Sequence, residues 1–271
     1  MIDNHLYSKI GIPDCVVPLI EHSWDAEPPS LYGRFDLAYR GDHPPKLLEY
    51  NADTPTSLLE AAVVQWYWLE ETHPEGDQFN SIHERLIGLW KELTPHFPGG
   101  RVDFCSLDNA EDWTTAMYLE DTAQQAGLSS SLFAIDEIGW DGARFVGLDD
   151  RPLTTVFKLY PWEWMVREEF GKYLAKTSTI WLEPPWKMLL SNKGLLPVLW
   201  ELYPNHPYLL AASFEGPSGA DWMRKPLLGR EGANITLRHA GIEIKIGGDY
   251  GQEGFVYQDA AQLKILTGCI Q

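Results

Sequence analysis

Polar and apolar side chains alternate along two short stretches near the start of the chain, residues 31–36 and 46–53. In a β-strand, residues two apart share a face, so this alternation predicts two strands that each have a polar face. Glycine and proline residues between the stretches predict a hairpin connection. The polar face of this hairpin would gather one guanidinium, two carboxylates and one amide, from Arg34, Asp36, Glu49 and Asn51.

The period of the apolar residues then changes from that of a strand to that of a helix. It predicts helices at residues 57–69 and at about residues 79–93. A β-branched and aromatic stretch at residues 102–107, a helical stretch at 113–125 and a second extended stretch at 132–138 follow. This order predicts a βαβ unit, which implies a parallel sheet covered by helices.

The rest of the chain has a different character. A strand is predicted at residues 154–160, and a helix begins at Pro161. Beyond residue 185, short extended stretches separated by turns predict an antiparallel lobe. We therefore expect an α/β fold with two domains, an α/β region at residues 1–185 and a smaller lobe at residues 186–271.

The charge balance limits the possible partners. The chain has 271 residues, enough to bury a sizeable core, and its 21 basic and 39 acidic residues give a formal net charge of -18. No basic stripe interrupts this acidity, so binding to nucleic acid is disfavoured. An anionic ligand would need a local cluster of lysine and arginine, or a divalent metal, to overcome the general negative field.

Cysteines and apolar runs indicate the compartment. Cys15, Cys105 and Cys269 lie far apart and form no CxxC pair, which argues against a zinc site or a disulfide framework. The start of the chain lacks a basic region followed by an apolar stretch, and no apolar run approaches the length of a membrane span. We therefore expect a cytoplasmic protein with no membrane partner.

The predicted hairpin face suits a magnesium ion that carries phosphate. Mg²⁺ prefers oxygen ligands, which Asp36, Glu49 and Asn51 would supply, and an arginine can bind the phosphate oxygens that the metal does not contact. A solvated, charged hairpin face is the alternative interpretation. The neighbouring Leu47 and Leu48 favour the site, because they place the carboxylates beside buried structure.

A second candidate stretch runs from Lys225 to Asn234 and contains Gly229 and Gly232. Such a loop can fold over phosphates and offer backbone N–H groups to them, although the chain contains no P-loop motif. A glycine-containing hairpin is the alternative interpretation. Together with Lys193, this loop and the distant hairpin form a scheme for binding Mg-ATP, in which the two lysines neutralise phosphate oxygens.

Long and specific motifs follow one another between about residues 30 and 258. They begin at Leu31 (LYGRFDLAY), Lys46 (KLLEYNADTPTSLLEA), Phe157 (FKLYPWEWM), Ser191 (SNK), Leu199 (LWELYPNHP) and Lys225 (KPLLGREGAN). These motifs resemble those of the glutathionylspermidine synthase family of ATP-grasp ligases. The resemblance implies an ATP-grasp fold of the glutathione synthetase ATP-binding type, with a central βαβ unit and an antiparallel nucleotide-binding lobe.

The resemblance also implies roles for individual residues. It implies that Asp36, Glu49 and Asn51 bind Mg²⁺, and that Arg34 stabilises the transition state. The ATP-binding residues that it implies are Arg34, Asp36, Lys193, Lys225, the loop residues Gly229, Arg230, Glu231 and Gly232, and Gln258. The substrate-binding candidates are Thr56, Glu111, Asp112 and Glu163, of which the acidic ones could attract a polyamine. A solvated helix start is the alternative interpretation of Glu111 and Asp112.

The implied function is an ATP- and Mg²⁺-dependent ligase that joins the carboxylate of a glutathione-like peptide to a spermidine-like amine through an acyl phosphate. The same chemistry on a different peptide or amine is one alternative. A catalytically inactive relative, which binds nucleotide or acts as a scaffold, is another. The chain starts close to Arg34 and stops soon after Gln258, so the resemblance implies an incomplete fold, truncated at its carboxyl end and short at its amino end.

Overall fold

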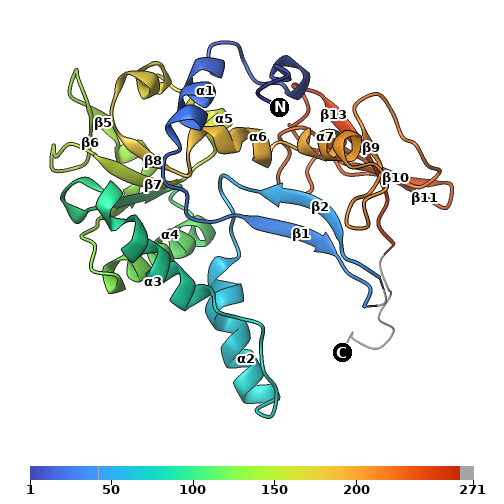
Figure 1. The fold of residues 1–271 in the computed structure, drawn as a ribbon, viewed down its shortest axis with the longest axis horizontal. Helices are drawn as coiled ribbons and strands as arrows, with labels where there is room; N and C mark the ends of the chain where they lie inside the picture. Colours follow the sequence, from blue (N-terminus) through green and yellow to red (C-terminus); the bar gives the residue numbers. More distant parts are fainter. Residues whose placement is uncertain (42, 263–271) are drawn as a thin grey trace. The chain divides into compact units, whose positions relative to one another are not determined.

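The computed structural model describes residues 1–41 and 43–262, and Figure 1 shows its ribbon. These residues form two compact units. Unit 1 contains Met1–Glu21, Arg34–Ala52 and the described residues from Lys187 onward, and unit 2 contains His22–Gly33 and Asp53–Trp186. Two residues considered in the sequence, Asp42 of the hairpin turn and Cys269, lie outside the described residues.

A parallel sheet forms the centre of unit 2, with the strand order β4-β3-β7-β8. Its strands are β3 (Asp103–Ser106), β4 (Leu132–Ala134), β7 (Thr155–Leu159) and β8 (Ile180–Leu182). Helix α4 (Ala110–Gln125) links β3 to β4 and packs against both, which confirms the predicted βαβ unit. Because β4 and β7 lie on opposite sides of β3, the chain reverses its direction of winding between β3 and β7.

Unit 2 also contains helices and a short hairpin. They include the π-helical segment Glu60–Val64, α2 (Gln65–Thr72), α3 (Ile82–Leu93), α5 (Trp162–Met165), and β5 (Gly139–Trp140) paired with β6 (Phe145–Val146). Helix α3 packs on α4 (Figure 1). The core of this unit is aromatic, because the fully buried Trp90, Phe104 and Phe157 all belong to it.

One predicted strand of unit 2 is shorter than expected. The extended stretch predicted at residues 132–138 ends at Ala134, and a 3₁₀ turn follows at Ile135–Glu137. The Glu137 carboxylate accepts a hydrogen bond from the Ala134 backbone N–H at 2.9 Å. This local bond competes with continuation of the strand and turns the chain away from the sheet.

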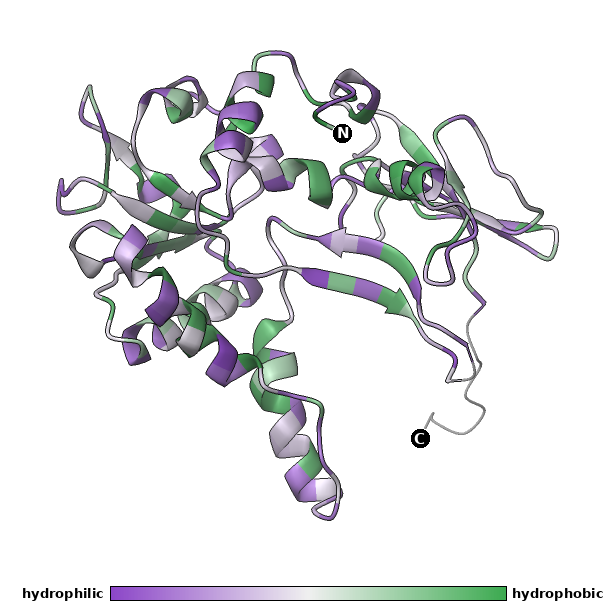
Figure 2. Ribbon diagram, viewed as in Figure 1, coloured by the Kyte–Doolittle hydropathy of each residue, from purple (hydrophilic) through white to green (hydrophobic). Residues whose placement is uncertain are grey.

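An antiparallel hairpin and an antiparallel sheet form most of unit 1. The hairpin strands β1 (Arg34–Ala38) and β2 (Lys46–Asn51) run side by side in Figure 1, and Figure 2 shows polar and apolar bands alternating along β1. The sheet has the order β12-β11-β10-β13-β9. Its strands are β9 (Ala212–Ser213), β10 (Trp222–Pro226), β11 (Thr236–His239), β12 (Ile242–Lys245) and β13 (Phe255–Asp259), accompanied by helices α6 (Met188–Ser191) and α7 (Leu195–Leu202).

Hydrogen bonds connect strand β2 to this later sheet. The Gln258 amide donates to Leu47 O at 2.9 Å, and Lys225 Nζ donates to Leu48 O at 3.0 Å. These contacts explain why the hairpin groups with the residues from 187 onward, whereas the sequence pattern placed it within an α/β region at residues 1–185. Helix α1 (Val17–Ala26) carries the chain from unit 1 into unit 2. Within residues 1–41 and 43–262, no helix has the length and apolar character needed to cross a membrane.

Candidate functional site

The hairpin of unit 1 brings together the four polar side chains that its alternation predicted. In the antiparallel register, Arg34 lies opposite Asn51, and Asp36 lies opposite Glu49. Arg34 donates to both carboxylate oxygens of Asp36, from Nε at 2.8 Å and from Nη2 at 3.2 Å. The Asn51 amide nitrogen lies 3.3 Å from Asp36 Oδ2 and 3.4 Å from Glu49 Oε1. The polar ends of all four residues therefore converge.

Two carboxylates face each other across this hairpin, an arrangement that is unfavourable unless positive charge compensates it. Arg34 compensates Asp36, and Lys193 Nζ lies 3.0 Å from Glu49 Oε2. Burial on its own would raise the pKa of Glu49, but the charges of Lys193 and Lys225 outweigh burial and hold the pKa below its usual value. Glu49 is therefore a stable carboxylate near neutral pH.

The donor set of the hairpin fits a magnesium ion. The Asn51 amide lies beside one oxygen of Asp36 and one of Glu49, and turning that amide over would present its oxygen at the same point. Mg²⁺ commonly binds one or two carboxylates and completes its shell with phosphate oxygens and water. Among the described residues, no group of three or more His, Cys, Asp and Glu side chains could hold a metal. An ion at this hairpin would therefore need the Asn51 amide and ligand oxygens in addition to the carboxylates of Asp36 and Glu49.

Two lysines reach the hairpin from the later part of unit 1. Lys193, just before α7, donates to Gly229 O at 2.6 Å in addition to its ion pair. Lys225, in β10, donates to Leu48 O at 3.0 Å and to Gln258 Oε1 at 2.8 Å. Burial lowers the pKa of Lys225 to about 8, because it disfavours the charged form of the amine.

The glycine loop after β10 lies beside these lysines. Gly232 has a φ of +69°, which glycine adopts without the steric cost that a Cβ would bring. A cavity of about 200 Å³ opens at this place in unit 1. The predicted residues that line it are Asp36, Glu49, Lys193, Lys225, Gly229, Glu231 and Gly232. Three parts of the chain that are distant in sequence thus line one cavity, as the Mg-ATP scheme requires.

The other predicted residues of unit 1 do not line this cavity. The described residues that line it do not include Arg34, Asn51, Arg230 or Gln258. Arg34 and Asn51 connect to the cavity through their hydrogen bonds to Asp36. Gln258 is only 3% exposed, and its amide accepts from Lys225 and donates to the backbone of β2. The Gln258 amide therefore links Lys225 to the backbone of β2.

The predicted substrate residues lie in unit 2. Glu111 and Asp112 are in the first turn of α4, which follows β3, and Glu163 is in α5, which follows β7. Ligands of open α/β sheets bind beyond the carboxyl ends of the strands, where the winding direction reverses. The three carboxylates therefore belong to segments at the expected edge of the sheet. Asn109 caps α4, and its amide donates to the Asp112 carboxylate at 2.8 Å, so Asp112 also has a role within the helix start.

Several buried charged residues of unit 2 were not predicted as site residues. Asp53, Lys158 and Glu183 are each exposed by 1% or less. Lys158 Nζ lies 2.6 Å from Asp53 Oδ1, so this pair forms a buried ion pair three residues before Thr56. A lysine inside an apolar strand stretch was the signal in the sequence, since a buried ammonium requires a buried partner.

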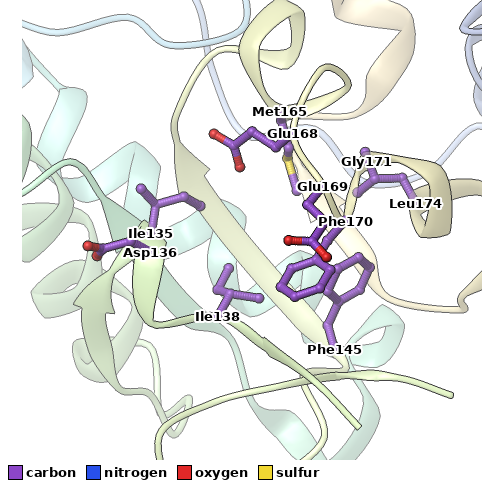
Figure 3. A pocket seen from close by; sticks show the side chains of 10 residues that line it. All are labelled: Ile135, Asp136, Ile138, Phe145, Met165, Glu168, Glu169, Phe170, Gly171 and Leu174. Carbon is purple, nitrogen blue, oxygen red and sulfur yellow. The ribbon is translucent and has the colours of Figure 1, made fainter. Parts of the chain in front are cut away.

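Unit 2 also contains a cavity of about 210 Å³ between the β5–β6 hairpin and the segment after α5. Figure 3 shows its apolar walls, which include Ile138, Phe145 and Phe170, and the carboxylates of Glu168 and Glu169. The Tyr160 hydroxyl donates to the Glu168 carboxylate. Burial, together with this neighbouring carboxylate, raises the pKa of Tyr160. No sequence pattern predicted this cavity.

Comparison with known proteins identifies relatives along nearly the whole chain. The family model described as "Glutathionylspermidine synthase preATP-grasp" matches residues 1–270. A relative from Haemophilus influenzae, named "Putative acid–amine ligase", is 46% identical over 97% of this chain and 71% of its own length. The trypanothione synthetase of Crithidia fasciculata is 28% identical over 96% of this chain and 45% of its own length. The bifunctional glutathionylspermidine synthetase/amidase of Escherichia coli is 27% identical over 94% of this chain and 46% of its own length.

The chain thus spans less than half of the length of the last two relatives. All three relatives are named as ligases or synthetases, which confirms the class of enzyme that the sequence motifs implied. The architecture is mixed α/β as predicted, with one parallel sheet and several antiparallel ones, and the family description carries the term preATP-grasp. The motifs, the fold and the match over residues 1–270 agree, and the chain belongs to the glutathionylspermidine synthase preATP-grasp family.

Proposed function

We propose that this protein is an ATP- and Mg²⁺-dependent ligase that joins a peptide carboxylate to an amine through an acyl phosphate. One observation carries the proposal: two hairpin carboxylates, two lysines and a glycine loop line a single cavity in unit 1. The chain has a net charge of -18, so a local group of buried or half-buried cations is a costly feature that an anionic ligand would justify. Carboxylates beside those cations suit a ligand that brings a divalent metal with it.

Each candidate site residue of unit 1 has a role in this proposal. Asp36, Glu49 and Asn51 hold Mg²⁺, which when bound supplies positive charge to the phosphate oxygens. Lys193 and Lys225 contact phosphate oxygens as point charges. The backbone N–H groups of residues 229–232, where Arg230 and Glu231 lie, cover the phosphates from the other side. Gln258 accepts a hydrogen bond from Lys225 and so helps to position its amine.

Arg34 is the residue that we propose to act on the reacting phosphoryl group. A substrate carboxylate is a poor electrophile, so its oxygen first attacks the γ-phosphorus of ATP and releases ADP, which forms an acyl phosphate. The guanidinium of Arg34 stabilises the negative charge that spreads over the transferred group. The amine then attacks the acyl carbon, phosphate leaves, and the amine nitrogen loses a proton to give the amide.

The proposed acceptors are a glutathione-like peptide and a spermidine-like polyamine. The names of the Crithidia and Escherichia relatives support this choice, as does the acidic character of Glu111, Asp112 and Glu163. Thr56 is the proposed contact for the peptide. Carboxylates attract a polycation at short range, and the negative field of the whole protein would steer it inward. Free ATP, glutathione and polyamines are cytoplasmic solutes, so we propose the cytoplasm as the site of action.

The test measures ADP released from Mg-ATP in the presence of glutathione and spermidine. We expect release that needs all three substrates, together with a product whose mass equals the two acceptors minus one water. A Lys225→Ala variant provides the background rate. Wild-type release no greater than this background would refute the ligase, and binding of Mg-ATP without release would instead support a nucleotide-binding relative. Release with another peptide or amine would redefine the acceptors.

A second variant tests the role of Arg34. Loss of a group that acts mainly in the transition state lowers turnover more than it lowers nucleotide affinity. Arg34→Ala should therefore reduce kcat strongly while the dissociation constant of Mg-ATP changes little. Arg144→Ala is a matched control, because Arg144 forms an exposed ion pair with Asp141 in unit 2. An equal loss of turnover and affinity in Arg34→Ala would contradict the assigned role.

A further inference from the structure

The ion pair between Lys158 and Asp53 is fully buried in unit 2. Lys158 is the fourth residue of β7, and its neighbours Phe157 and Leu159 are buried too. Lys158 has no exposed surface and Asp53 is 1% exposed. Burial lowers the pKa of Lys158, and the nearby Asp53 and Glu163 carboxylates oppose that effect. In some proteins a buried ion pair that is costly to desolvate fixes a specific arrangement of the chain.

Several contacts of this pair lie at the carboxyl end of β7. Lys158 Nζ binds Asp53 Oδ1 at 2.6 Å, donates to Tyr160 O at 2.9 Å, and lies 4.4 Å from the centre of the Trp162 ring. The second oxygen of Asp53 accepts from the Trp162 backbone N–H at 2.9 Å. Asp53 therefore accepts a hydrogen bond from the first backbone N–H of α5, while Lys158 holds Asp53 in position.

This arrangement determines where two substrate candidates lie. Asp53 is followed by residues 54–56, so fixing Asp53 fixes the chain that presents Thr56. Trp162 is followed directly by Glu163, so the same carboxylate also fixes the start of the helix that presents Glu163. Both candidates thus depend on one buried carboxylate and the lysine that holds it.

A second set of contacts closes the network. The Glu183 carboxylate accepts from the backbone N–H groups of Leu31 at 3.0 Å and Tyr32 at 2.9 Å. The Tyr32 hydroxyl donates to Pro55 O at 2.7 Å, within the segment that leads to Thr56. The Trp162 indole N–H donates to Glu183 O at 2.9 Å. Residues 54–56 are therefore held at their start by Asp53 and at Pro55 by the Tyr32 hydroxyl. Trp162 is hydrogen-bonded both to Asp53 and to Glu183, which binds the backbone of Tyr32.

We propose that Lys158 is a positioning residue for the acceptor side of the ligase: through Asp53 it sets the place of residues 54–56 and of Glu163. The inference rests on the proposed function, because it takes Thr56 and Glu163 to contact the acceptors. Lys158 itself touches no substrate. Its effect is on the productive orientation of the acceptors, and nucleotide binding in unit 1 does not depend on it.

Unit 2 offers a matched control at the opposite end of the sheet. Asp103, the first residue of β3, is 1% exposed and pairs with Arg101 at 2.7 Å and with Arg151 at 2.9 Å. Asp103→Asn would disturb another ion pair of unit 2 that has a buried carboxylate, yet the register partner of Asp103 is Val156 at the amino end of β7. A purely structural role predicts that the Asp103 and Lys158 variants behave alike.

The experiment compares wild type, Lys158→Met and Asp103→Asn by steady-state kinetics, urea unfolding and amide hydrogen exchange. A small displacement of bound reactants costs on the order of 100-fold in rate, so we expect kcat/KM for the peptide and the amine to fall by about that factor in Lys158→Met. Its KM for ATP should stay unchanged. Asp103→Asn should unfold at lower urea but keep its kinetic constants. The backbone amides of residues 54, 56–58 and 162–165 should exchange faster in Lys158→Met alone.

The outcomes separate the two proposals. Absent ADP release by wild type refutes the ligase, whereas hydrogen exchange still decides whether Lys158 orders residues 54–56. Unchanged kcat/KM in a folded Lys158→Met, or equal kinetic losses in Asp103→Asn, would overturn the positioning role. Should Lys158→Met not fold, Lys158→Met combined with Asp53→Asn removes both charges and keeps an acceptor for the Trp162 N–H. The same loss of kcat/KM is expected for that variant.

Discussion

The titration of Lys225 should control nucleotide binding by this protein. Burial lowers the pKa of Lys225 to about 8, and the amine donates to Leu48 O and Gln258 Oε1. A phosphate ligand needs the charged form of the lysine. Free protein with neutral Lys225 is therefore incompetent to bind, and the apparent dissociation constant rises in inverse proportion to the competent fraction. From pH 7 to pH 9 that fraction falls about tenfold, so affinity should fall about tenfold.

The assay is calorimetric titration with a non-hydrolysable ATP analogue and saturating Mg²⁺ at pH 7, 8 and 9. Lys225→Arg is the control, because a guanidinium keeps its charge across this range. We expect its absolute affinity to differ but its pH dependence to be flat. An affinity for wild type that is equal at pH 7 and pH 9 would refute the reasoning, as would the same decline in Lys225→Arg.

The same lysine should affect stability in a defined pH window. Its pKa in the folded protein lies below its ordinary value of 10.5, so the unfolded chain binds more protons between about pH 8 and pH 10.5. The destabilisation from burying the charged amine is fully present below pH 8 and is lost as the pH rises toward 10.5. The shift corresponds to about 3 kcal/mol. Urea unfolding should show this rise in wild type and not in Lys225→Met.

Three further predictions concern buried polar groups and the metal. Gln258→Leu leaves Leu47 O and Lys225 each short of one partner, so urea unfolding at pH 7 should show a loss of about 1–3 kcal/mol, and an unchanged midpoint would disprove the bridge. Glu183→Gln sets an amide against backbone N–H donors of residues 31 and 32 and should cost roughly 2–3 kcal/mol in the same assay, with Glu169→Gln as an exposed control. Glu49→Gln should raise the Mg²⁺ concentration needed for half-maximal ADP release roughly 10- to 100-fold, and a wild-type requirement would remove Glu49 from the metal site.

The hairpin site could be predicted because its information is local. Alternation within β1 and β2 determines which side chains share a face, and the observed register places Arg34 opposite Asn51 and Asp36 opposite Glu49. The glycine loop could be predicted in the same way, because Gly229 and Gly232 follow Lys225 closely in the sequence. Family motifs supplied Lys193, whose approach to Glu49 no local pattern encodes, because α7 and β2 are far apart in sequence.

The rest could not be predicted because it depends on long-range pairing. Lys158 visibly needed a partner, but Asp53 lies 105 residues away and reads as part of the hairpin stretch. Glu183 likewise follows an apolar strand, and its donors are backbone groups that have no sequence signature. The domain division differed for the same reason, since Gln258 and Lys225 bind β2 across most of the chain.

The attachment of β2 to the late sheet has a consequence for biosynthesis. Gln258, which binds Leu47 O, is added by the ribosome 211 residues after Leu47. At 5–20 residues per second this delay is about 10 to 40 s, during which the nascent hairpin has none of its later partners. The segment that carries Arg34 and Glu49 is thus translated early but completed late. Slowing elongation should lengthen the time during which nascent chains present this hairpin to chaperones.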